Sequence, residues 1–143
     1  MNGILARIGA SIIAVTALCS CDGLFDDSGE RSQVGTISFF GEPVVIEVPD
    51  TVAQGQPFSV GVRTYGNGCV SVGRTEVMVT GLQAVVTPYD THGGGEICPD
   101  ILRRFDHETT ITFDQAGTGA VRFRGLREPE DTITTEVRTV HVR

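Results

Sequence analysis

The residues that could bind a metal ion or exchange protons gather between positions 90 and 108. The carboxylates and imidazoles of this segment are Asp90, His92, Glu96, Asp100, Asp106, His107 and Glu108. Zinc accepts histidine and carboxylate ligands and calcium accepts several oxygens, so the residue types suit either ion. Their spacing matches neither an HExxH zinc motif nor an EF-hand series. We therefore predict a solvated acidic loop, and the alternative is a small-ligand or metal-binding site that uses Asp90, His92 and His107.

His107 directly precedes a run with the alternation of a β-strand. Histidine is a residue of intermediate burial that often finds a polar partner inside a protein. We predict a buried or capping histidine at the start of a strand.

Nucleophilic catalysis has little support in the sequence. The serines Ser38, Ser59 and Ser71 stand outside any Gly-x-Ser-x-Gly elbow. The glycine-rich stretches 66–68 and 93–95 are not followed by the lysine and helix of a phosphate-binding loop. We therefore expect that the protein is not an enzyme and carries no cofactor.

Residues 1–20 have the organisation of a bacterial secretion signal. Met1–Arg7 carries one positive side chain, and Ile8–Leu18 is uncharged and mostly apolar. A bilayer span needs about 20 apolar residues, so this run is too short to cross a membrane and suits a signal peptide. The alternative is a buried helix, but no later segment has the helical pattern to pack against it.

This leader ends in Leu18-Cys19-Ser20-Cys21. The ending resembles the lipobox of bacterial lipoproteins, in which a branched apolar residue and a small residue precede the modified cysteine. The resemblance implies that Cys21 becomes the first residue and carries a lipid, which anchors a protein stably when two or more acyl chains are present. We expect attachment to a bacterial membrane in the cell envelope, on its periplasmic or outer face. The alternative is ordinary signal-peptidase cleavage nearby, without lipid.

If the leader removes Cys19 and lipid occupies Cys21, two of the four cysteines remain. Exported proteins reside where disulfides persist. We therefore predict a disulfide between Cys69 and Cys98 that ties two loops at one end of the fold. The alternative is two free thiols that act as metal ligands.

The charge balance excludes one class of partner. The chain has 18 acidic and 11 basic residues and a net charge of −7. An acidic protein without a basic cluster repels phosphate backbones, so we expect no nucleic-acid binding. A basic stripe would require a loop fold that brings together Arg103, Arg104, Arg122, Arg124 and Arg127.

Two segments follow the leader. Residues 21–35 are polar, acidic and glycine-containing, which is typical of a flexible tether. The alternative is an edge strand that starts before residue 36. Residues 36–143 have β signals throughout, so we assign them to a single domain, with a long loop at 90–106.

The domain has the alternation of half-buried strands. Phe58, Val60 and Val62 alternate with more polar or smaller neighbours, and turn signals recur along the chain. Such spacing predicts an all-β fold, an antiparallel β-sandwich of about seven or eight strands. In the last strand, Ile133 and Val137 fall on the face opposite Val140, which predicts a bulge near Arg138 or Thr139.

Two stretches carry a family resemblance. The run 52–60 is similar to the first long strand of bacterial immunoglobulin-like domains, and the runs 112–117 and 121–123 are similar to their penultimate strand pair. The resemblance implies an immunoglobulin-like or fibronectin-III-like sandwich. The chain departs from antibody domains because it lacks tryptophan, and because the spacing from Cys69 to Cys98 is too short for the usual inter-sheet disulfide.

These inferences together predict a non-catalytic module of the cell envelope. It would be held to a membrane through lipid at Cys21 and would recognise a protein or glycan through its loops and sheet edge. A structural subunit of an envelope complex is the competing interpretation.

Overall fold

The computed structural model describes residues 29–95 and 97–143, and these residues contain ten strands and no helix. The predicted signal peptide 1–20 and the predicted lipid site Cys21 lie outside the described residues. The strands are β1 (Arg31–Val34), β2 (Thr36–Ser38), β3 (Ile46–Glu47), β4 (Thr51–Val52), β5 (Pro57–Gly66), β6 (Val70–Thr80), β7 (Gln83–His92), β8 (Arg103–Thr112), β9 (Gly117–Arg127) and β10 (Thr132–Val142).

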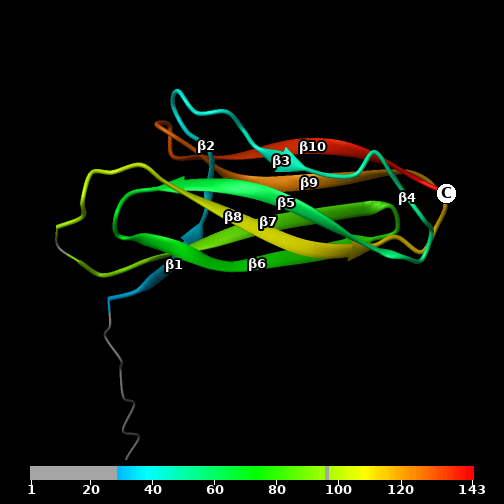
Figure 1. Ribbon diagram of the computed structural model, residues 1–143, viewed down its shortest axis with the longest axis horizontal. Coiled ribbons are helices and arrows are strands. Elements are labelled where there is room, and N and C mark those ends of the chain that lie inside the picture. Colours follow the sequence, from blue (N-terminus) through cyan, green and yellow to red (C-terminus); the bar gives the residue numbers. More distant parts are fainter. Residues whose placement is uncertain (1–28, 96) are drawn as a thin grey trace, which may run out of the picture.

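The strands form one hydrogen-bonded network arranged in two groups that face each other (Figure 1). In one group, β5 lies between β3 and β8. In the other, β7 lies between β6 and β9, and β10 follows β9 and carries the short strand β4. Strand β2 pairs with both β5 and β9, so it joins the two groups.

The all-β class is confirmed, but the prediction of a purely antiparallel fold with about seven or eight strands is wrong. The pairs β7–β9, β2–β9 and β4–β10 are parallel. Parallel neighbours need a crossover connection. For β7 and β9 that connection is β8, which belongs to the opposite group. The additional strands are short segments at the edges of the network.

Inward-facing side chains of the two groups make one apolar core. Along β5, Phe58, Val60 and Val62 are buried at alternate positions, as the sequence predicts. The ring of Phe113 lies 5.6 Å from that of Phe58. The other buried members are Ile37, Val52, Ala84, Val86, Ile111, Val121, Phe123, Val140 and Val142.

Three local predictions need correction: the extent of the tether, the length of the β7–β8 loop and the bulge in the last strand. Arg31–Val34 forms β1 against β7, so the predicted tether 21–35 includes an edge strand. Strand β7 continues through His92 and β8 begins at Arg103, so the connecting loop is shorter than predicted. The predicted bulge in the last strand is absent, because β10 pairs with β9 in unbroken register from Thr132 to Val142.

Candidate functional site

Several connections of the domain enclose a pocket of about 550 Å³. Two of them, the β5–β6 turn and the β7–β8 loop, lie at the end of the domain away from the C-terminus (Figure 1). The β5–β6 turn, the β2–β3 connection, the β7–β8 loop and the β9–β10 turn all contribute residues to the pocket. Its lining is Gln33, Thr36, Phe39, Tyr65, Gly66, Asn67, Val70, His92, Asp100, Ile101, Leu102 and Glu128. The lining combines aromatic and aliphatic side chains such as Phe39 and Leu102 with polar ones such as His92 and Glu128, and a cavity of this size is a candidate binding site.

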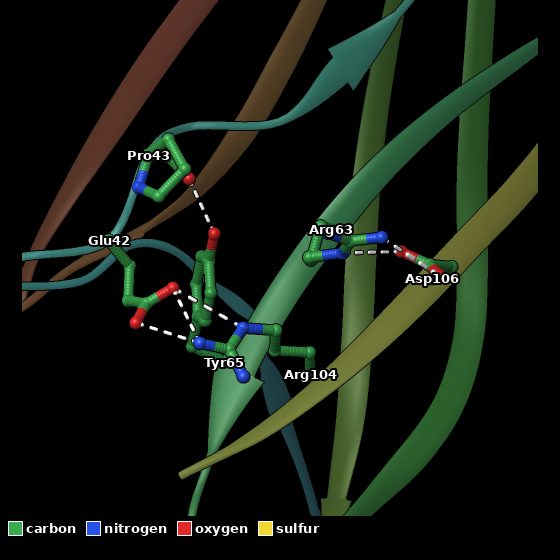
Figure 2. Close-up of polar contacts among 6 residues, drawn as sticks. All are labelled: Glu42, Pro43, Arg63, Tyr65, Arg104 and Asp106. Carbon is green, nitrogen blue, oxygen red and sulfur yellow. Dashed lines mark hydrogen bonds and ion pairs between the residues drawn. The ribbon is translucent and has the colours of Figure 1, made fainter.

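Tyr65 forms one aromatic wall of the pocket. Its side chain is buried, and its ring lies 6.1 Å from the ring of Phe39. Its hydroxyl donates a hydrogen bond to the carbonyl oxygen of Pro43 (Figure 2). Burial raises the pKa of Tyr65, and the nearby carboxylate of Glu42 raises it further. The neutral phenol, which can donate this hydrogen bond, is therefore the favoured form.

An ion pair holds the β2–β3 connection above strand β8. Arg104 donates from Nη2 to both carboxylate oxygens of Glu42, at 2.9 Å each (Figure 2). Both side chains keep contact with solvent, so the pair contributes little to the overall stability. Its consequence is positional, because it fixes the segment that carries Phe39 and Pro43.

A second ion pair lies farther along the same two strands. Arg63 and Asp106 are direct cross-strand partners, and their Nε and Oδ1 atoms are 2.7 Å apart (Figure 2). The hydrogen bond from Arg63 lowers the pKa of Asp106, and the same contact raises the pKa of Arg63. Neither residue lines the pocket, so this pair supports the strand pairing instead.

A disulfide pins the β7–β8 loop to the β5–β6 turn. Cys69 and Cys98 lie at disulfide-bonding distance, with their Cα atoms 5.2 Å apart. The amide of Gly68 donates to the carbonyl of Pro99 at 3.0 Å. A Cβ at Gly68 would lie 2.7 Å from the Pro99 ring, so only glycine permits this close contact. The pairing ties two connections at one end of the fold, as the sequence predicts.

Large apolar side chains stand exposed on the segments around the pocket. Phe40 on the β2–β3 connection is 84% exposed. On the β7–β8 loop, Ile97 is 90% exposed and Ile101 is 56% exposed. Large apolar side chains exposed on neighbouring connections are a feature of many protein interaction sites.

A chain of polar contacts crosses the interior beside this end. The hydroxyl of Thr75 on β6 lies 3.1 Å from Nδ1 of His107 on β8. Nε2 of the same imidazole lies 2.9 Å from Oδ1 of Asp90 on β7. The side chains of His107 and Asp90 are each 1% exposed.

This order of hydroxyl, imidazole and carboxylate is also that of catalytic triads. Thr75 does not line the pocket, whereas a nucleophile must reach the substrate. The contacts instead connect β6 and β7 with β8 of the opposite group, where no backbone pairing joins them. We interpret the chain of contacts as a polar cross-link between the two groups of strands.

The structure corrects the prediction of a solvated loop that contains Asp90, His92 and His107. Asp90 and His92 belong to β7, and His107 lies within β8 and not at its start. Asp90 and His107 are paired in the interior, as the prediction of a buried histidine implies, while His92 lines the pocket. Within residues 29–95 and 97–143, no three His, Cys, Asp or Glu side chains gather as a metal site.

The five arginines considered for a basic stripe do not form one. Arg103 and Arg104 lie on β8, which pairs with β5, and the other three lie on β9, which pairs with β7 and β10. Sequence reasoning did not single out Glu42 or Tyr65, because no motif marks side chains that come together from separate segments of the chain.

No protein-family model, curated protein or solved structure matches the chain. Among the described residues there is also no helix long and apolar enough to cross a membrane.

Proposed function

We propose that the chain is a lipid-anchored envelope protein whose β domain, an immunoglobulin-like sandwich without catalytic activity, recognises a protein partner at the pocket end. The lipobox resemblance at Cys21 supports the anchor. The alternating strands and the similarity of residues 52–60 to bacterial immunoglobulin-like domains support the fold assignment.

The observation that carries the recognition role is the presence of large exposed apolar side chains on the connections that form one pocket. Ile101 lines the pocket, and Phe40 and Ile97 lie exposed on two of the connections that form it. A small ligand would need only the cavity, whereas protein interfaces centre on apolar and aromatic anchors with a polar rim. This arrangement favours a protein over a glycan or a small ligand.

The disulfide and the Glu42–Arg104 ion pair support the same role. They hold two of the pocket-forming connections in place before any partner binds. A pre-ordered surface loses less conformational entropy on binding, so more of the contact energy remains as affinity.

The anchor is tested by the intact mass of the protein isolated from its native membrane. We expect cleavage before Cys21 and the added mass of a diacylglycerol, and we expect a Cys21→Ser variant to lose both the added mass and membrane retention. An unmodified Cys21 would overturn the lipid anchor without affecting the recognition proposal.

Recognition is tested by cross-linking in cells followed by recovery of the tethered protein. Phe40→Glu and Ile101→Glu should each abolish recovery of the partner, because they place a charge in the apolar contact. Met78→Glu is the matched control, since Met78 is 70% exposed on β6 and does not line the pocket. Equal recovery with all three variants would refute recognition at the pocket end. Binding that survives proteolysis of the extract but not glycosidase treatment would replace the protein partner with a glycan.

A further inference from the structure

Strand β10 leaves most of one edge open. It pairs with β9 along its whole length, but on its other side β4 reaches only His141 and Val142. The amide of His141 donates to the carbonyl of Asp50 on that side. Because backbone groups alternate in direction along a strand, those of Ile133, Thr135, Val137 and Thr139 point to the same side, where no strand of the described residues pairs with them.

Native proteins usually protect such an edge with proline, lysine, a bulge or an inward-facing charge. Residues 132–140 contain no proline or lysine, and the unbroken register with β9 excludes a bulge. The edge does carry two charges on its inward face, Glu136 and Arg138, whose side chains are 3.7 Å apart. On the outward face, Ile133 and Val137 are 46% and 48% exposed.

We infer that this edge pairs antiparallel with the same edge of a second copy of the chain, about a twofold axis at Val137. This interface lies outside the proposed recognition site and extends the proposed function to an assembly of two copies. In a twofold interface each contact occurs twice, so one matching pair of residues contributes two interactions.

The charges select this register. With the axis at Val137, Glu136 of each copy lies opposite Arg138 of the other. If the axis moves to Glu136, two carboxylates oppose each other, and if it moves to Arg138, two guanidinium groups do so. Like charges directly opposite are destabilising, while opposite charges stabilise a cross-strand pair. Inward-facing charges normally block edge pairing, but with the axis at Val137 the charges of Glu136 and Arg138 neutralise each other across the interface.

The backbone permits the same register. Val137 would face Val137 of the second copy, and Thr135 would face Thr139. All of these residues direct their amide and carbonyl groups to the open edge, so each facing pair exchanges two hydrogen bonds. The pairing ends before His141, whose amide already donates to the carbonyl of Asp50, directly before β4.

The test is the concentration dependence of the mass of the full chain in detergent, measured by light scattering after gel filtration. We expect a monomer–dimer equilibrium for the wild type. Arg138→Glu and Glu136→Arg each place like charges opposite each other and should raise the dissociation constant about tenfold or more. The double variant Glu136→Arg with Arg138→Glu restores both opposite-charge pairs and should restore the dimer.

Arg31→Glu is the matched control, because Arg31 is an exposed arginine on β1, which pairs with β7 and not with β10. A second variant, Val137→Pro, removes an amide that the monomer does not use, so it should abolish the dimer and retain the thermal transition of the monomer. In hydrogen exchange, the amides of Thr135, Val137 and Thr139 should become protected only as the concentration rises.

A wild type that is monomeric at every concentration would overturn the inference. So would a dimer that survives both single charge reversals, or a double variant that stays monomeric while folded. Protection of the edge amides only after another envelope protein is added would also overturn it, because the occupant would then be a different chain.

Discussion

Nε2 of His107 lies 2.9 Å from Oδ1 of Asp90, and both side chains are almost completely shielded from water. The two residues come from strands in opposite groups of the fold. A buried polar group that loses its partner costs more free energy than the intact contact contributes. The pair therefore couples the stability of β7 to that of β8.

We expect Asp90→Ala to lower the free energy of unfolding by about 3 kcal/mol, because it leaves the imidazole of His107 buried without its carboxylate partner. The measurement is equilibrium unfolding in urea. Asp106→Ala is the control, since it removes an exposed carboxylate from the same strand as His107 and should change stability much less. If the effects of Asp90→Ala and His107→Ala simply added within about 0.5 kcal/mol in the double variant, the coupling would be absent.

The cross-link between Cys69 and Cys98 has a sequence separation of 29 residues. In the loop-entropy model, closing a loop of about 30 residues contributes about 3.6 kcal/mol to stability. We expect the double variant Cys69→Ser, Cys98→Ser to lose about that amount in urea unfolding, and reduction of the wild type to have the same effect. Identical unfolding midpoints under oxidising and reducing conditions would contradict this expectation.

Tyr65 should make the domain sensitive to alkaline pH. Burial raises the pKa of Tyr65 above its ordinary value of 10.0 in the folded state. Its contribution to stability is therefore complete below pH 10 and is lost as the pH rises through the raised pKa. The measurement is the ultraviolet titration of tyrosinate in a Tyr89→Phe variant, in which Tyr65 is the remaining tyrosine.

The control for that titration is Tyr65→Phe, which should remove the loss of stability attributable to this phenol. A Tyr65 that ionises at the ordinary tyrosine pKa while the protein remains folded would show that the aromatic wall is open to solvent.

Two strand glycines should differ sharply in their tolerance of alanine. A Cβ at Gly125 would lie 2.5 Å from the Ile37 side chain and 2.9 Å from the carbonyl oxygen of Gly35. A Cβ at Gly61 would have its nearest neighbour at 3.6 Å. We expect Gly125→Ala to destabilise by about 1–3 kcal/mol through overpacking, with Gly61→Ala near neutral. Equal thermal midpoints for the two variants would contradict this account.

The alternation of apolar and polar residues along the strands allowed the buried residues of β5 to be predicted correctly. Phe58, Val60 and Val62 repeat with the period of a half-buried strand, and the structure buries all three. The cysteine count likewise led to the pair Cys69 and Cys98, on the expectation of an exported chain whose remaining cysteines form a disulfide.

Polar residues at inward positions account for the main errors. Asp90 and His107 occupy inward positions of β7 and β8, but their polarity made the segment look like a solvated loop. His107 lies two residues after Phe105 and four before Ile111, so its spacing from them is that of residues on one buried face of a strand. Its partner could not be found from spacing, because contact with Asp90 depends on how the two groups of strands face each other.

The parallel strand pairs and the pocket could not be predicted from the sequence for the same reason. Local pattern does not specify which group each strand joins, and so it cannot show that β8 serves as the crossover between β7 and β9. The apolar residues Ile133 and Val137 suggested a bulge because they were assumed to face the core, whereas the continuous register leaves them on the surface.

Strand β1 also determines how the domain would bear mechanical load. Arg31 pairs with His92 and Val34 with Tyr89, so β1 enters beside the end of β7 and runs antiparallel to it. A pull on the segment before Arg31 acts along the axis of this strand and loads its inter-strand hydrogen bonds together in shear. Bonds loaded together resist rupture better than bonds that open one by one. In a domain suspended from its N-terminal side, drag would therefore pass between β7 and β1 through several hydrogen bonds at once.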